Sequence, residues 1–289
     1  MQLFVFLIFY PILWLVSMLP FPLLYLFSDA IYVVVYYGIG YRKKIVRDNL
    51  ALALPHLSDQ ERLVIEKKFF HHLCDIFMEM AKTITISEKE IEKRYVLKNL
   101  DLYLDMEKKN KSIALVCAHY ASYEWAVSMN RHTTFEGYGI YKKLANPHFD
   151  KLVKDIRNRF KATLITTRET IPTIKKNAIS GHLGTYGFAS DQSPQLSATY
   201  HWHRFMGIEV PVHTGAEMLA KRFDMNVIFL KTKKVKRGYY EATFEVLSLD
   251  AKSVPNYDIT DDFLSRVEKQ IHEAPEFYLW THKRWKHRR

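Results

Sequence analysis

Glycine and cysteine are scarce in this chain of 289 residues, which contains 10 glycines and 2 cysteines. The phosphate-binding patterns G-x-x-x-x-G-K-[ST] and G-x-G-x-x-G are absent, and so is the hydrolase pattern G-x-S-x-G. These absences argue against a nucleotide-binding loop and against a serine hydrolase of that kind. Two cysteines make no disulfide framework, which fits a reducing compartment, and Cys117 lies in an apolar run typical of a packed thiol.

Acidic residues are also in the minority. The chain has 42 lysines and arginines against 31 acidic residues, which gives a formal net charge of +11. Such an excess favours nucleic acid, an anionic membrane, or acidic ligands and partners, and composition does not choose among them. Hydrophobic residues make up 48% of the chain, enough to build a sizeable core in one large domain or two small ones.

Charge is missing altogether from the N-terminal region. No charged residue occurs between Leu3 and Leu19, and Asp29 alone interrupts the apolar sequence that continues to Tyr37. A membrane span needs ~20 apolar residues, and residues 3–27 satisfy that length. Prolines within the run suggest kinks, so we expect a span followed by an interfacial segment. These prolines are Pro11, Pro20 and Pro22.

A basic cluster follows the apolar run directly and contains Arg42, Lys43, Lys44 and Arg47. The positive-inside rule places this end of the run in the cytoplasm. We therefore predict a membrane anchor with a juxtamembrane basic segment over residues 1–47 and a globular domain over 48–289 that faces the cytoplasm. The alternative is a buried hydrophobic hairpin of a soluble fold.

The remainder of the chain alternates between helix and strand patterns. Ser58 and Glu61 form a capping box that opens a helix to about residue 82. The alternation predicts an α/β fold with a mixed sheet flanked by helices. Expected strands are 113–118, 138–141, 163–166, 185–190, 226–231 and 240–247, and expected helices are 122–131, 147–160, 170–179, 214–223 and 260–274.

His119 and Glu124 are the most informative pair for function. The apolar run 113–118 is typical of a buried strand, and it ends in His119. Catalytic groups of α/β sheets collect at the carboxyl ends of strands. We expect Glu124, five residues later in a helix, to turn back and hold one imidazole nitrogen. The other nitrogen would then take a proton from a hydroxyl, and because no nucleophile motif accompanies the pair, that hydroxyl would belong to the substrate.

Further polar groups follow other predicted strands. Tyr141, Lys142 and Asn146 follow the second strand, Arg168 follows the third, and Asp191 with Gln192 follows the fourth. Each could share one cleft with His119, because parallel neighbours present their carboxyl ends together. The alternatives are an exposed ion pair for Arg168 and a turn or helix cap for Asp191. The basic run 231–237 lies between two expected strands and is typical of a solvated hairpin.

These features together resemble the lipid A late acyltransferases, the lauroyl and myristoyl transferases within the lysophospholipid and glycerolipid acyltransferase superfamily. The resemblance covers almost the whole chain, although Lys142 and Lys143 stand where the family usually has Arg-Pro. Ala118 precedes the histidine where relatives that acylate glycerol phosphates often have Asn. The matching segments are the N-terminal anchor, Tyr41-Arg42-Lys43-Lys44, Asn49-Leu50, His119 with Glu124 as H-x4-D/E, Tyr141 with Asn146-Pro147, Asp191-Gln192, and the tail from Tyr278 to Lys286.

The resemblance implies an O-acyltransferase with a glycerolipid acyltransferase-like fold, anchored in the bacterial inner membrane. Its donor would be an acyl thioester, expected to be acyl carrier protein, and its acceptor a hydroxyl of a lipid A precursor. His119 would be the general base supported by Glu124, and no cofactor would be required. The residues expected to bind substrate are Arg168, Asp191, Gln192, Tyr141, Lys142, Asn146 and Arg284.

Two alternatives remain open from the sequence. The acceptor could be a lysophospholipid or an ornithine or glycine aminolipid, and coenzyme A could replace the carrier protein. A protein of another class, a membrane-tethered basic binding protein without catalysis, is disfavoured because no nucleic-acid recognition module is visible. We expect no metal site, because His201-Trp202-His203 has no further ligand at a defined spacing and the His71, His72 and Cys74 spacing matches no zinc pattern.

Overall fold

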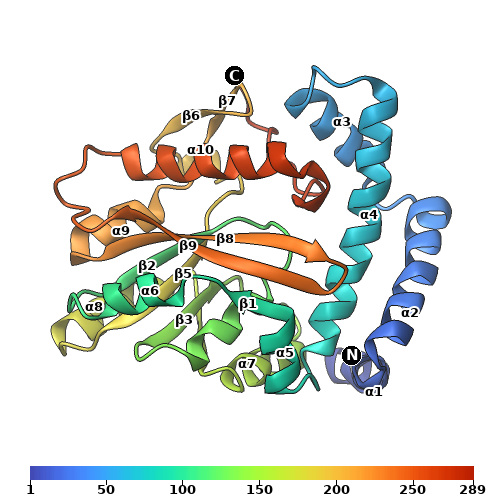
Figure 1. Cartoon of the computed structure of the whole chain (residues 1–289), viewed down its shortest axis with the longest axis horizontal. Coiled ribbons are helices and arrows are strands. Elements are labelled where there is room, and N and C mark those ends of the chain that lie inside the picture. The colour runs from blue at the N-terminus through green and yellow to red at the C-terminus, as the bar shows by residue number, and fades with distance from the viewer.

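A seven-stranded sheet forms the centre of the molecule, which the computed structural model describes over residues 1–289 (Figure 1). The strand order is β1-β9-β8-β2-β5-β3-β4, and a separate hairpin pairs β6 with β7. The strands are β1 (Tyr95–Leu97), β2 (Ile113–Cys117), β3 (Glu136–Tyr141), β4 (Ala162–Thr166), β5 (Gly184–Ala189), β6 (Trp202–Phe205), β7 (Ile208–Pro211), β8 (Asn226–Lys236) and β9 (Tyr239–Ser248).

The sheet is mixed, as the alternating pattern predicts. Strands β2, β3, β4, β5 and β8 are parallel to one another, whereas β9 returns antiparallel to β8 and pairs in parallel with β1. The carboxyl ends of the five parallel strands therefore share one edge of the sheet. The α/β class and all six expected strands are confirmed, and the short strand β1 and the β6–β7 hairpin are additional.

Helices cover both faces of the sheet. In Figure 1, α10 lies above the sheet, α5, α6 and α7 lie below it, and α4 stands across the edge towards which β8 points. The helices of the globular part are α3 (Lys43–Ala53), α4 (Asp59–Lys82), α5 (Glu88–Arg94), α6 (Leu100–Glu107), α7 (Pro147–Asn158), α8 (Thr170–Ile179), α9 (Gly215–Phe223) and α10 (Asp258–Glu273). The capping box at α4 is confirmed, because Ser58 and Glu61 exchange both of its hydrogen bonds.

The core lies between these layers. β2 and the first half of β8, residues 226–230, are almost fully buried, since each lies between helices and has a neighbouring strand on both sides. Such strands need apolar side chains on both faces, which explains the continuous run Ile113 to Val116. Three tryptophans, Trp125, Trp280 and Trp285, are the largest buried side chains. The tail is thus part of the core.

The apolar N-terminus forms two helices that pack on the globular part. α1 (Gln2–Met18) ends before Pro20, and α2 (Phe21–Val33) continues into a π-helical turn, Val34–Ile39. The apolar run 3–27 is therefore not one continuous helix: it is interrupted at Pro20, one of the prolines at which a kink was expected. The segment Phe21–Ile39 is long and apolar enough to cross a membrane by length and composition.

Polar side chains attach these two helices to α4 and to the β8–β9 turn. Lys82 of α4 donates to the carbonyls of Ser17 and Leu19 at the end of α1. Arg237 donates to both Asp29 of α2 and Asp75 of α4, at 2.6 Å in each case. The basic run 231–237 was expected to be a solvated hairpin, but Arg237 at its end is held by these two carboxylates.

Candidate active site

His119 and Asp191 form the centre of the candidate site. Nδ1 of His119 lies 2.7 Å from Oδ1 of Asp191, and the same oxygen accepts a hydrogen bond from the backbone N–H of His119 at 3.1 Å. The His119 side chain is 20% exposed, whereas that of Asp191 is 1% exposed. The carboxylate is thus sealed inside the protein, and the imidazole forms the boundary with solvent.

The strand register brings this pair together. Cys117 of β2 lies beside Ala189 of β5, and the two strands run in parallel. His119 lies two residues after Cys117, and Asp191 lies two residues after Ala189. Both residues therefore lie just beyond the carboxyl ends of neighbouring strands, at the same level of the sheet. A parallel edge collects groups in this way because adjacent strands are only about 4.8 Å apart.

Charge in the pair is set by burial and by mutual attraction. Burial alone would lower the pKa of His119, but the negative charge and hydrogen bond of Asp191 outweigh it and raise the pKa above the usual 6.5. Burial would raise the pKa of Asp191, whereas the charge and hydrogen bonds of His119 lower it. The carboxylate therefore stays ionised and favours the proton on Nδ1, which leaves Nε2 free to accept another.

Glu124 does not hold the imidazole, which corrects the sequence-based expectation. Its carboxylate pairs with Arg157 of α7, and the Arg157 guanidinium also donates to the Glu124 carbonyl at 2.9 Å. The expected helix over 122–131 is a 3-10 helix that begins at Trp125, after a turn in which Ala121 has a φ of +49°. Since no α-helix leads from His119 to Glu124, the glutamate points towards α7.

The C-terminal tail closes the buried side of the pair. The backbone N–H of Leu279 donates to the carbonyl of His119 at 3.1 Å, and Tyr120 forms a bridge with Tyr278. His282 accepts a hydrogen bond from the Ser193 N–H at 3.2 Å, and burial lowers its pKa to about 4. The tail is therefore ordered beside the site, in agreement with the resemblance.

Arg284 lies in this buried region, not on a solvent-facing wall. Its side chain donates to the carbonyl of Pro211 at 3.1 Å, and its Nε and Nη2 atoms are buried without partners. Burial lowers the pKa of Arg284, while the charges of Tyr278 and Asp191 oppose that change. Arg284 thus places a positive charge behind the carboxylate of Asp191, where a bulky lipid phosphate has no access.

The motif containing Tyr141 and Asn146 shapes the loop after β3. The Tyr141 hydroxyl donates to Asp150 at 3.0 Å, and Asn146 caps α7 by accepting from the N–H of His148. The Asn146 amide also donates to the carbonyl of Gln2 at 2.9 Å, so this loop contacts the start of α1. Lys142 is exposed on the same loop.

Arg168 belongs to the same edge of the sheet as His119. It follows the last residue of β4 by two positions, as His119 follows β2 and Asp191 follows β5. Its side chain is exposed and makes no hydrogen bond or ion pair with the His119–Asp191 pair. Because β4 is three strands away from β2, Arg168 lies about 14 Å from His119 along this edge. Gln192 is half-buried next to Asp191.

A basic cavity of about 410 Å³ lies beside the tail segment that contacts His119. Phe277 lines it, and the carbonyl of Phe277 accepts a hydrogen bond from Ala121, two residues after His119. We call this the basic cavity. Its lining is Tyr32, Lys67, Lys68, His71, His72, Lys234, Glu276 and Phe277.

His72 presents a buried donor at the basic cavity. Burial and the charge of Lys234 lower the pKa of His72, which keeps the ring neutral. Its Nδ1 accepts from Lys234 at 3.0 Å, so Nε2 carries the proton, and that atom is buried without a partner. This cavity was not among the sites expected from the sequence. The signal was present, since Lys67 and His71, like Lys68 and His72, are spaced i, i+4 along one helix.

The nearest thiol does not offer a nucleophile. Cys117 stands at the end of β2, and burial raises its pKa to about 12, with a further contribution from Asp191. A thiol with such a pKa is not a thiolate at neutral pH. Cys117 is therefore packed at the end of its strand, as the apolar run predicts, and does not supply a nucleophile.

Comparison with known proteins gives a consistent picture. The model of the family "Bacterial lipid A biosynthesis acyltransferase" matches residues 1–287. The chain is 26% identical to a lipid A biosynthesis lauroyltransferase of Escherichia coli (strain K12) over 96% of this chain and 90% of that protein. It is 23% identical to a lipid A biosynthesis palmitoleoyltransferase of the same organism and to a lipid A biosynthesis acyltransferase of Shigella flexneri, over 96% of this chain and 89% of each relative.

The structure has a mixed α/β sheet with a histidine–carboxylate pair at the carboxyl ends of its strands. Such a pair has the chemistry needed to activate a hydroxyl group. The chain belongs to the bacterial lipid A biosynthesis acyltransferase family, and it is an acyltransferase. Its family implies a lipid A precursor as the acceptor.

Proposed function

We propose that this enzyme moves a fatty acyl chain from an acyl thioester, carried by acyl carrier protein, to a hydroxyl of a lipid A precursor at the membrane. The observation that supports this most directly is the 2.7 Å contact between His119 and the buried Asp191. The contact leaves Nε2 of a partly exposed imidazole available to the acceptor hydroxyl.

The reaction needs one proton shuttle and no covalent enzyme intermediate. Nε2 of His119 takes the proton of the acceptor hydroxyl as the oxygen attacks the thioester carbonyl. The tetrahedral intermediate collapses, the carbon–sulfur bond breaks, and the imidazolium returns the proton to the departing thiolate. Asp191 fixes the tautomer and stabilises the imidazolium, which is the role first expected for Glu124. Arg284 is then a positioning residue behind Asp191.

The basic cavity is proposed to hold a phosphate of the acceptor. Lys67, Lys68 and Lys234, which line the cavity, supply the positive charge that a phosphate requires. Lysines bind phosphate as point charges, so the arrangement suits an anionic headgroup without strict geometry. Since the lining residue Phe277 contacts the turn after His119, a lipid bound here has its sugar hydroxyls close to the base.

Arg168 and Lys142 are proposed to bind anionic groups at the far end of the same edge. Both are exposed, and both follow parallel strands beyond their carboxyl ends. A bisphosphorylated acceptor or the acidic carrier protein carries charge over such a distance. Gln192 is proposed to donate to the acceptor beside Asp191, whereas Tyr141 and Asn146 shape the loop that carries Lys142.

The N-terminal helices are proposed to hold the enzyme on the inner membrane with its catalytic domain in the cytoplasm. α1 exposes large apolar side chains along its length, including Leu7, Ile8 and Leu15. Asn146 and Gln2 join α1 to the loop after β3, so this apolar surface adjoins the catalytic edge of the sheet. A lipid acceptor therefore reaches His119 from the membrane side, and Arg42, Lys43 and Lys44 face anionic headgroups.

A competition assay tests the proposed acceptor and donor. Purified enzyme would be given one acyl chain on acyl carrier protein or on coenzyme A, together with a lipid A precursor, a lysophospholipid and an ornithine lipid. We expect preferential acylation of the lipid A precursor from the carrier protein. Preferential acylation of another lipid would reject the acceptor, faster transfer from coenzyme A would reject the donor, and failure with all combinations would reject both.

A further inference from the structure

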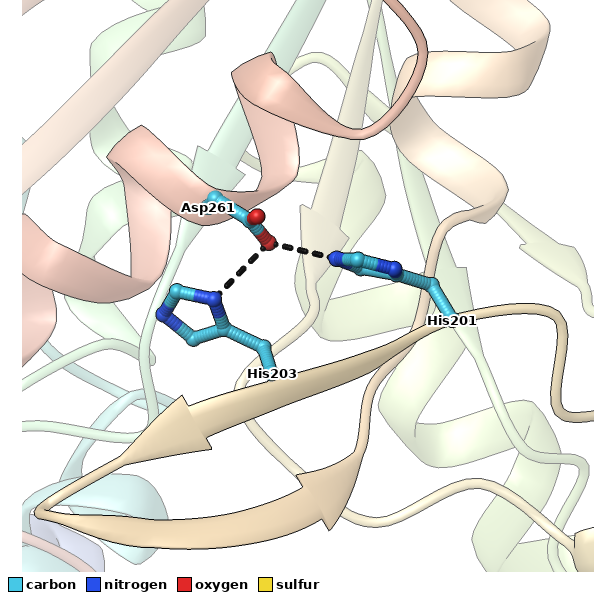
Figure 2. A group of neighbouring side chains, drawn as sticks. All are labelled: His201, His203 and Asp261. Carbon is cyan, nitrogen blue, oxygen red and sulfur yellow. Dashed lines mark hydrogen bonds and ion pairs between the residues drawn. The ribbon is translucent and has the colours of Figure 1, made fainter.

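Two histidines and an aspartate converge on one point outside the catalytic site. His201 directly precedes β6, His203 lies in β6, and Asp261 comes from the first turn of α10 (Figure 2). Oδ1 of Asp261 lies 2.9 Å from Nε2 of His201 and 3.1 Å from Nδ1 of His203. All three ligand-type atoms lie within 4.8 Å of one another. We call this group the His–His–Asp cluster.

We propose that the His–His–Asp cluster binds a zinc ion, or a zinc-like first-row divalent ion, that joins the β6–β7 hairpin to α10. Two imidazole nitrogens and one carboxylate oxygen are the ligand types that zinc takes in proteins, commonly with one further position for water. Bonds of 2.0–2.2 Å in a tetrahedral site separate ligand atoms by about 3.3 Å, close to the two separations in the cluster.

The local fold explains why these side chains face the same point. Residues two apart in an extended segment project to the same side, so His201 and His203 point together while Trp202 points away. Trp202 instead carries the guanidinium of Arg289 over its ring, 3.6 Å from the centroid. The ring of His201 stacks on Tyr257 at a centroid distance of 4.3 Å and an interplanar angle of 6°, which fixes its orientation.

Access and charge also suit an ion. The three side chains are 21%, 18% and 33% exposed, so solvent reaches the cluster while most of each side chain is packed. A metal is bound by the unprotonated nitrogen of an imidazole and by an ionised carboxylate, so the three ligands together would carry one negative charge towards a divalent ion. Each imidazole needs only to place its proton on the ring nitrogen that faces away from Asp261. Nitrogen ligands disfavour Mg²⁺ and Ca²⁺, which prefer oxygen.

The sequence did not predict this site because its third ligand is distant in the chain. Asp261 follows His203 by 58 positions and lies on another element, so no ligand spacing was visible. The proposed ion is structural and takes no part in the proton shuttle of His119. It would stabilise the hairpin that ends at Pro211, whose carbonyl accepts from Arg284.

The test is zinc binding by the full-length enzyme, purified without a histidine tag and stripped with a chelator. We expect one Zn²⁺ per chain by calorimetry and by elemental analysis after dialysis. The melting temperature should rise by about 5 °C at a hundredfold excess over Kd, and Mg²⁺ should give no rise. His203→Asn and Asp261→Asn should each weaken zinc binding at least about 100-fold.

The control variant is His182→Asn, which removes a histidine paired with a single carboxylate, Glu136, at 3.2 Å. This variant should bind zinc like the wild type. X-ray absorption of the wild-type zinc complex gives a result that does not depend on folding of the variants, and it should show two imidazoles and no sulfur ligand. No saturable binding, unchanged binding in both cluster variants, or sulfur at about 2.3 Å would overturn the proposal.

Discussion

Nδ1 of His119 and Oδ1 of Asp191 lie 2.7 Å apart although 72 residues separate them in the chain. The contact arises because β2 and β5 are parallel neighbours in register, and each residue follows its strand by two positions. The proposed base is therefore oriented by a carboxylate from the adjacent strand. This arrangement differs from the local His119–Glu124 pair that the H-x4-E motif suggests, and it leads to distinct predictions for the two acids.

Asp191→Asn should lower the transfer rate at least 100-fold and shift its pH dependence. The charge of Asp191 raises the pKa of His119 above 6.5, and a general base works only when deprotonated. In the wild type, kcat/KM should therefore rise with pH through a value above 6.5. Without the carboxylate the pKa of the buried imidazole falls, so the acidic limb should move to lower pH. If Asp191→Asn kept full activity and the acidic limb of its pH dependence did not shift, Asp191 would not be the residue that orients the base.

Glu124→Gln should act mainly on stability. Removal of one partner from this partly buried ion pair leaves Arg157 without its counter-charge, which should cost about 1–3 kcal/mol of unfolding free energy. Thermal or urea unfolding measures this loss. The double variant with Arg157→Met should recover part of the stability, because no unpaired charge remains. The pH dependence of kcat/KM in the double variant should have the same acidic limb as in the wild type. A shift like that of Asp191→Asn would instead show that Glu124 supports the His119 base.

Lys67→Ala with Lys68→Ala should raise KM for a phosphorylated acceptor about tenfold and change kcat little. Both lysines line the basic cavity and are exposed, so their loss removes charge without opening the core. Steady-state kinetics at low and high salt would measure the effect, which should shrink as salt screens the charges. The matched control is alanine at Lys175 and Lys176, an adjacent exposed pair on α8. Equal effects of both pairs would reject the cavity as the phosphate site.

Serine at Leu7, Ile8 and Leu15 together should release the enzyme from vesicles while it stays folded. These α1 side chains are exposed in the protein, so the change removes apolar surface proposed to lie in lipid. Co-sedimentation with anionic vesicles would measure binding, and carbonate should leave the wild type in the membrane pellet. A control with serine at Ile179, Leu196 and Leu249, also exposed, should bind normally. Retained binding of the α1 variant would contradict the proposed anchor.

The sequence predicts the central fold well, because the spacing of apolar residues along the chain reflects which positions are buried. Strands β2 and β8 are covered on both faces, and their continuous apolar runs mark them clearly. The N-terminal region was harder to predict, since an apolar run has the same composition whether it crosses lipid or packs on α4. Pro20 was visible as a kink, and in the structure it separates two helices.

The site was only partly predictable for a related reason. His119, Asp191 and Arg168 all stand beyond strand ends, so their common edge follows from the topology. Which carboxylate meets the imidazole depends on strand order and register, which no local motif contains. The left-handed backbone at Ala121 also prevents the helical path that would have returned Glu124 to His119. Pairing across neighbouring strands therefore had to come from the structure.

The most direct test of the central claim is the transfer rate of His119→Ala with carrier-protein donor and lipid A precursor as acceptor. Circular dichroism and vesicle binding should match the wild type, because the imidazole is partly exposed at the site boundary. A positioned general base typically contributes at least 10²-fold, so the rate should fall by that factor or more. Retention of more than about a tenth of the wild-type rate would contradict the account of His119 as the base.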